Sequence, residues 1–144
     1  AALCDMVKTV EILRRSSEYA RIVDEEEAVI ITELGYVSRW LEKWAPESLK
    51  FRLTDEVNPD EFSPEQKEYL RRLADDIAEA PAGADGNWFH QAIYAYKESG
   101  LLLPRELFTT IYRALIGKDS GPRAGWFLSI LPRDWLIERL RLVK

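Results

Sequence analysis

Apolar residues recur at helical spacing along almost the whole chain, and this spacing predicts an all-α fold. A first helix is predicted from residue 3 to about residue 21. A second, with the acidic run 25–27 in its first turn, is expected to reach Trp44, since acidic side chains suit the positive end of a helix. Gly35 lies inside this second helix and is expected to kink or break it. Five apolar side chains are predicted to share one side of its second half: Tyr36, Val37, Trp40, Leu41 and Trp44.

Proline and glycine mark the ends of the later helices. Ser63 is expected to cap a helix with Pro64 at its first position and Gln66 at its third. Gly100 is expected to end one helix, and Pro132 to open the last. The predicted helices span 63–80, 87–98, 104–116, about 122–131 and 132–142, after a connector at 47–62 with an extended piece at 49–53. Their predicted core residues are Leu70, Leu73, Ile77, Phe108, Ile111, Tyr112, Leu115, Leu136 and Leu140.

The glycine- and proline-rich segment 81–86 is the predicted boundary between two helical parts, residues 1–80 and residues 81–144. Charge changes at about the same place. Residues 88–144 carry nine Lys and Arg against five acids, a net charge of +4, and the other eleven bases and twenty acids give residues 1–87 a charge of −9. Such an acidic half joined to a basic half is compatible with an RNA surface at one end, and equally with two solvated faces.

Cysteine usage and hydropathy indicate the compartment. The single cysteine, Cys4, has no partner within the chain, which is typical of a cytoplasmic protein. No apolar run approaches the roughly 20 residues that cross a bilayer, so no membrane partner is expected. The sequence opens on Ala-Ala-Leu-Cys without a methionine, as expected of a piece of a longer protein.

Histidine and cysteine, the usual ligands of zinc, are scarce in this chain, with one of each. His90 is the only histidine, and a zinc site of ordinary ligands would have to combine it with Cys4 and carboxylates. There is no Cys/His dyad at readable spacing, no Ser-His-Asp order and no glycine-rich phosphate loop. We therefore expect no catalytic residue, no metal and no cofactor in this segment, and a structural or solvent-edge role for His90.

The most informative segment is 108–127, which predicts a helix, a glycine stop, a polar loop and a new helix. Gly117 suits a left-handed helix end, and Pro122 suits the first turn of the helix that follows. Gly121 and Gly125 are expected to leave backbone amides uncovered. Single-stranded RNA is bound by such means, with bases stacked on aromatic rings and hydrogen-bonded on their edges.

The candidate RNA-binding residues of this segment combine positive charge, aromatic rings and small loop residues. Lys118 and Arg123 supply charge on either side of the loop, and Tyr112 and Trp126 offer stacking faces. The alternative is a capped helix–helix turn with solvated charges and buried aromatics. The full candidate set is Tyr112, Arg113, Lys118, Gly121, Pro122, Arg123, Ala124 and Trp126.

The same segment resembles the C-terminal end of class I lysyl-tRNA synthetases, which reads Ile-Tyr-x-x-Leu-x-Gly-Lys-x-x-Gly-Pro-Arg-x-Gly-x-Phe. This chain matches the pattern from Ile111 to Phe127. Further likeness lies at 40–47, 63–73, 91–94 and 137–141, and the resemblance covers roughly residues 28–143.

The resemblance implies a helical bundle followed by a helical cage that receives the anticodon of lysine tRNA. A catalytic domain with His-x-Gly-His and Lys-x-Ser-Lys signatures, using ATP with Mg²⁺, would precede this region, and neither signature occurs here. Gly121, Pro122 and Ala124 match positions that line the anticodon bases in the related glutamyl enzymes. Those enzymes often carry Arg where this chain has Tyr112, with Arg113 next, so the role of that helix position does not carry over directly.

Two other functions fit the sequence. Residues 1–87, which are acidic and carry Trp40 and Trp44, suit a helical protein–protein interaction module without RNA binding. The second of these functions is that of a standalone paralogue, which acts on tRNA without an attached synthetase. Retention on RNA that falls steeply with salt would separate RNA binding from the first of these.

Overall fold

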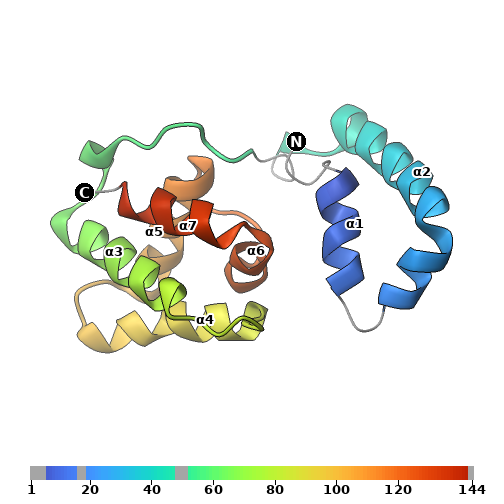
Figure 1. The fold of residues 1–144 in the computed structure, drawn as a ribbon. Coiled ribbons are helices and arrows are strands. Elements are labelled where there is room, and N and C mark those ends of the chain that lie inside the picture. Colours follow the sequence, from blue (N-terminus) through green and yellow to red (C-terminus); the bar gives the residue numbers. More distant parts are fainter. Residues whose placement is uncertain (1–5, 16–18, 48–51, 143–144) are drawn as a thin grey trace. The chain divides into compact units, whose positions relative to one another are not determined.

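The computed structural model describes residues 6–15, 19–47 and 52–142, and within these ranges every regular element is a helix (Figure 1). The predicted all-α class is confirmed. The chain forms two compact units, Ala1–Arg52 and Leu53–Lys144. None of the described helices has the length and apolar composition that a membrane span requires.

The first unit is a pair of helices, α1 (Met6–Arg15) and α2 (Ala20–Trp44), that pack against each other. Val23 of α2 is almost completely buried, and Val10 of α1 is buried too. The Arg14 guanidinium reaches from α1 to two carboxylates of α2, at 3.1 Å from Asp24 and 2.9 Å from Glu27. Apolar contact and exposed ion pairs thus hold the two helices together.

The path of α2 differs from the sequence prediction in two ways. It begins at Ala20, several residues earlier than expected, and its kink lies at Glu26, where φ is −128° and ψ is 27°. The kink predicted at Gly35 is wrong, because Gly35 continues the helix in open surroundings. Residues 3–5, and most of the extended piece predicted at 49–53, lie outside the described residues.

The second half of α2 carries an exposed apolar face. Tyr36, Val37, Trp40 and Trp44 are each at least 50% exposed. Arg39 lies over the Tyr36 ring at 4.8 Å, and Lys43 over the Trp44 ring at 5.2 Å. Exposed aromatic side chains in such number on one helix are typical of a contact surface.

The second unit begins with a 3₁₀ turn, η3 (Pro59–Glu61), followed by α3 (Pro64–Ala78). The predicted cap of α3 is confirmed: the Gln66 amide donates to Ser63 Oγ at 3.2 Å, and the Ser63 amide donates to Gln66 Oε1 at 2.9 Å. The boundary predicted from the sequence between residues 80 and 81 falls inside this unit, because α3 packs against the C-terminal helix α7 (Arg133–Arg141).

Three further helical elements follow α3: α4 (Gly86–Ala95), the short η4 (Tyr96–Ser99) and α5 (Pro104–Ile116). Asp85 caps α4 by accepting from the amides of Asn87 and Trp88 at 3.1 and 3.0 Å. Gly100 ends η4 at a φ of 69°, as the sequence predicts. These local signals fix where α4 begins and where η4 ends.

The last two helices, α6 (Ala124–Ile130) and α7, complete the core of the second unit. Figure 1 shows α4 running beneath α3, with α6 beside it, and α6 packs closely on α4. Phe108, predicted to be core, is only partly buried, and Leu107 points inward in its place. The other predicted core residues of this unit are buried: Leu70, Leu73, Ile77, Ile111, Tyr112, Leu115, Leu136 and Leu140.

A buried arginine joins α7 to the connector that precedes η3. Arg139 is 6% exposed, and its Nη2 donates to the carbonyls of Thr54 and Asp55 at 2.5 and 3.0 Å. The Thr54 amide in turn donates to the Leu115 carbonyl at the end of α5, at 2.8 Å. This chain of bonds ties three separate stretches of sequence to one point.

Replacing Arg139 with alanine should therefore destabilise the second unit by about 2–4 kcal/mol, because two carbonyls would lose a charged donor. Urea unfolding followed by far-ultraviolet circular dichroism measures this loss. Arg141→Ala is the matched control on the same helix, since Arg141 makes an exposed ion pair with Asp75 at 2.7 Å and should cost at most about 1 kcal/mol. Equal losses for the two variants would contradict the bracing role of Arg139.

Candidate nucleic-acid interface

The loop between α5 and α6 starts at a left-handed glycine. Gly117 has a φ of 66° and caps α5, and its amide donates to the Arg113 carbonyl at 3.2 Å. A side chain at this position would be strained by the backbone conformation. The glycine stop predicted from the sequence is confirmed, and it turns the chain out of α5 into the loop.

Tyr112 holds the far side of the same loop. Tyr112 is 7% exposed, and its hydroxyl donates to the Pro122 carbonyl at 2.5 Å. A Cβ on Gly121 would lie 2.9 Å from the Tyr112 ring and 2.9 Å from Ile116 Cδ1, so the loop passes directly over these side chains. Burial raises the pKa of the Tyr112 phenol. Tyr112 therefore braces the loop and does not present the open stacking face predicted from the sequence.

Charged side chains stand on the outer surface of the loop. The Arg113 guanidinium lies 2.6 Å from the Asp119 carboxylate, and this hydrogen bond and charge lower the pKa of Asp119 and raise that of Arg113. Lys118 and Arg123 are both exposed. Among Arg113, Lys118, Arg123 and Asp119 there are three positive charges and one negative charge, so the loop is basic although the chain is acidic.

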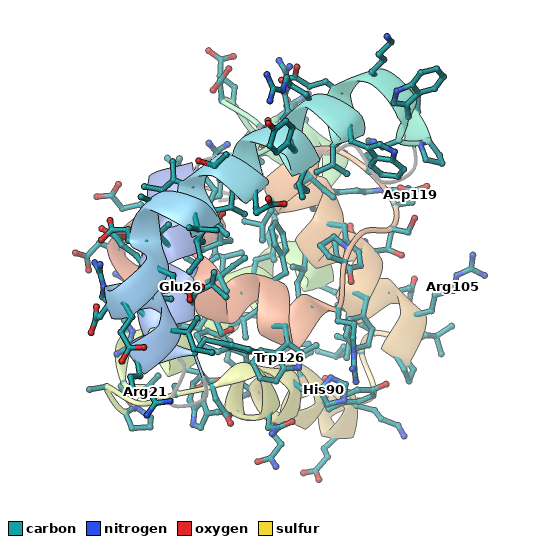
Figure 2. The ribbon with its side chains drawn as sticks, turned by 90° about the vertical axis from the view of Figure 1, so that its right-hand side faces the viewer. Arg21, Glu26, His90, Arg105, Asp119 and Trp126 are labelled. Atoms are coloured by element: carbon teal, nitrogen blue, oxygen red, sulfur yellow. The ribbon has the colours of Figure 1, made fainter. Side chains whose placement is uncertain are left out.

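The first turn of α6 packs against α4. A Cβ on Gly125 would overlap the Gly86 carbonyl and lie 3.1 Å from His90, so this glycine serves close helix packing. The prediction that Gly125 leaves its amide uncovered is not supported, because Gly125 is buried. Trp126 lies over Gly86, above α4 (Figure 2), and 53% of its surface is exposed.

The structure brings some of the predicted residues together and separates others. Tyr112, Gly121 and Pro122 are in contact, and Arg113 approaches the loop through Asp119. Pro122 lies two residues before α6 begins, just outside its first turn. Ala124 is buried, whereas Trp126 lies across α4, away from the loop tip at Asp119 (Figure 2).

Sequence reasoning missed the residues that support the loop from a distance. Thr54 and Arg139 brace the end of α5, and Gly86 receives α6, but none of these contacts has a local sequence signal. His90 stands at the solvent edge with its ring 4.7 Å from Tyr94, in keeping with the role expected from the sequence. Among the described residues, no group of three or more His, Cys, Asp or Glu is placed to bind a metal ion.

Comparison with known proteins identifies relatives whose sequences match nearly the whole chain. A lysine–tRNA ligase of Thermoplasma acidophilum is 36% identical in an alignment that covers 96% of this chain and 28% of that protein. That of Methanosphaera stadtmanae is 36% identical over 78% of this chain and 21% of its own length. The chain is homologous to one segment of the archaeal lysine–tRNA ligases. No protein-family model matches it.

The lysine–tRNA ligase of Archaeoglobus fulgidus extends the comparison, with 31% identity over 95% of this chain and 27% of its own length. The chain thus spans about a quarter of the length of the relatives it matches. In two of these ligases the aligned segment includes nearly all of both units described above, so the homology is not restricted to the α5–α6 loop.

The contact between α4 and α6 gives a test of how the loop is anchored. Gly125→Ala should destabilise the second unit by at least about 1–3 kcal/mol, because the new methyl group would meet backbone atoms of α4. Gly83→Ala is the matched control, since nothing lies within 4 Å of a Cβ there. Denaturant unfolding of the two variants compares these losses, and a Gly125→Ala protein as stable as Gly83→Ala would show that α6 does not need this close approach.

Proposed function

We propose that this chain is the anticodon-recognising part of a class I lysine–tRNA ligase and that the α5–α6 loop is its RNA contact. The homology to lysine–tRNA ligases supports the tRNA partner. The single structural observation that carries the proposal is an exposed basic loop held on a rigid frame, with Lys118 and Arg123 projecting from it.

The loop would bind RNA without making or breaking covalent bonds. Uridines, in which the lysine anticodon is rich, stack weakly and are easily splayed. Exposed loop residues such as Gly121 would allow a base edge to approach the backbone, and Arg123 would offer a guanidinium plane for stacking. Lys118 would position a phosphate, which adds affinity without sequence preference.

The ion pair of Arg113 and Asp119 gives the loop a further function in this proposal. Asp119 keeps the Arg113 guanidinium beside the loop in the protein alone. An RNA phosphate competes with the carboxylate for the same donors, since guanidinium binds both groups in a similar geometry. Arg113 would then contribute to RNA binding only when its ion pair with Asp119 breaks.

The proposal places aminoacylation elsewhere in the parent protein. A covalently linked catalytic domain, working in the cytoplasm with ATP and Mg²⁺, would activate lysine and transfer it to the tRNA. This chain would contribute the choice of tRNA. It supplies no catalytic residue in this account.

A second candidate function rests on the exposed apolar face of α2. Tyr36, Trp40 and Trp44 are each more than half exposed, which favours contact with another protein surface. Such binding would bury apolar area and persist in high salt, whereas RNA binding through phosphates weakens steeply. The two functions are compatible, because they use different units.

The loop proposal is tested by removing one positive charge at a time. Arg123→Ala should weaken binding to the anticodon stem-loop of lysine tRNA by about 1–3 kcal/mol, because a base contact is lost. Lys118→Ala should mainly reduce the salt dependence of binding. The slope of log affinity against log salt concentration should fall by about one unit. Fluorescence titrations at several salt concentrations measure both effects.

Arg21→Ala is the matched control for charge. Arg21 lies on α2 with its side chain 86% exposed, in a long 3.9 Å pairing with Glu25. A general electrostatic attraction would make Arg21→Ala and Arg123→Ala equally weak binders. Equal losses would therefore refute the assignment of the site to the loop.

A further inference from the structure

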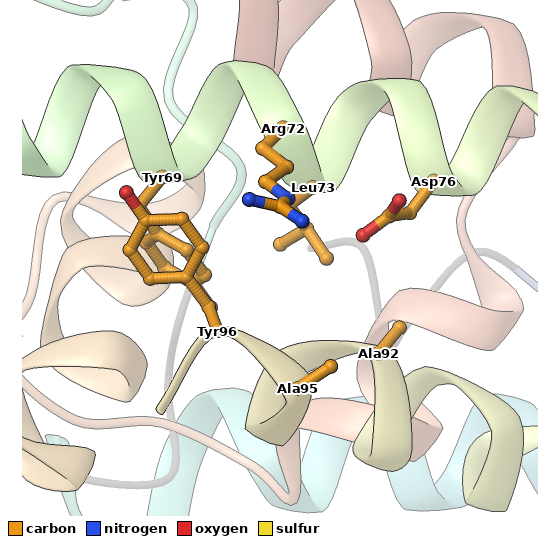
Figure 3. Close-up of a pocket in the computed structure, with 7 residues that line it drawn as sticks. All are labelled: Tyr69, Arg72, Leu73, Asp76, Ala92, Ala95 and Tyr96. Atoms are coloured by element: carbon orange, nitrogen blue, oxygen red, sulfur yellow. The ribbon is translucent and has the colours of Figure 1, made fainter. Parts of the chain in front are cut away.

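A cavity lies in the second unit, between α3 and α4 and separate from the α5–α6 loop. Its volume is about 180 Å³. Figure 3 shows Arg72 and Asp76 reaching down from α3 into this space, with Ala92 and Ala95 of α4 beneath them. Clefts for drug-sized ligands are larger, roughly 300–1,000 Å³, so this cavity suits a single ring system.

The two charged side chains of the cavity are not paired with each other. Arg72 and Asp76 are one helical turn apart, a spacing at which opposite charges often meet. No ion pair joins them in the described part of the chain, and the Arg72 guanidinium lies over the Tyr96 ring, 6.0 Å from its centroid. Their neighbours Arg71 and Asp75, by contrast, are paired with Glu68 and Arg141.

Tyr69 adds a buried donor to the same wall. It is 1% exposed, its ring packs 4.9 Å from that of Tyr96, and within the described residues its hydroxyl has no hydrogen-bond partner. Burial raises the pKa of Tyr69, so the group stays a neutral O–H donor. A buried hydroxyl without an acceptor is costly, and a ligand that supplies one recovers this cost.

These groups follow a definite order along α3. Tyr69 and Arg72 are donors, and Asp76, one turn further on, is an acceptor. A guanine presents the complementary order along its edges: N7 and O6 accept, and N1–H and N2–H donate. Adenine has a donor, its amino group, where guanine has O6, so it would oppose the Arg72 donor.

We propose that the α3–α4 cavity binds one unpaired guanine base. The choice of a nucleobase rests on the proposed RNA-binding function, and the order of donors and acceptors selects guanine among the bases. The base would lie over Ala92 and Ala95, whose small side chains leave room for a flat ring. In a bound tRNA, the guanine in this cavity would be a second contact with the protein, independent of the contact between the anticodon and the α5–α6 loop.

The test uses the 144-residue chain and guanosine monophosphate as the probe. Guanosine monophosphate is titrated into the chain, and NMR spectra follow the amide and methyl resonances of Ala92 and Ala95. Their chemical shifts should change and then saturate. Adenosine monophosphate, which carries the same phosphate and ribose, should bind more weakly by roughly five- to 150-fold. Equal affinities for the two nucleotides, or no shift at either alanine, would overturn the proposal.

Two variants, Asp76→Asn and Tyr69→Phe, with Asp75→Asn as the control, separate the base contact from general effects. Asp76→Asn should abolish the preference for guanosine monophosphate, whereas Asp75→Asn, which removes the same charge one residue away, should retain it. Tyr69→Phe should lower the affinity without lowering the melting temperature, because the hydroxyl makes no bond in the protein alone. Equal effects of Asp75→Asn and Asp76→Asn would contradict the model of base recognition.

The remaining alternative is a free amino acid, whose carboxylate and ammonium groups would also complement Arg72 and Asp76. Shifts at Ala92 and Ala95 produced by lysine or glycine, and none by guanosine monophosphate, would overturn the guanine assignment. Failure in the nucleotide titration leaves the stem-loop titrations of Arg123→Ala unaffected. Conversely, loss of the Arg123 effect would refute the loop site while the cavity still binds guanine.

Discussion

The carboxyl end of α5 is the point on which the second unit depends. The Leu115 carbonyl there accepts from the Thr54 amide, and the Thr54 carbonyl accepts from the buried Arg139 of α7. Helix ends leave carbonyls without intrahelical partners, and burying such groups unpaired is costly. One connector residue and one arginine therefore satisfy the end of α5 and fix α7 beside it.

The same helix end determines what the α5–α6 loop can present. Gly117 turns the chain outward, Tyr112 holds Pro122 from below, and Gly121 must stay small because the Tyr112 ring lies beneath it. The backbone of the loop is therefore largely preorganised, while Lys118 and Arg123 stand exposed on it. A preorganised loop loses little conformational entropy on binding, so its contacts contribute more fully to affinity.

Local chemistry explains which parts of the fold could be predicted. The Ser63 cap and the glycines at 100 and 117 act within one helical turn, so the sequence predicts them well. The contact of Arg139 with Thr54 spans 85 residues of chain, and no local pattern encodes it. The packing role of Gly125 depends on α4 lying beside α6, and the burial of Tyr112 depends on the path of the loop. From sequence alone both are therefore predicted, wrongly, to be exposed RNA-binding features.

The central claim is that the loop distinguishes anticodons, and titration of the unmodified chain tests it most directly. Two stem-loops with identical stems would be compared, one with the lysine anticodon and one with its anticodon bases exchanged. The account predicts tighter binding to the lysine stem-loop, by about 1–3 kcal/mol for each base that is read. Equal affinities for the two stem-loops would contradict it, whatever the effect of salt on either.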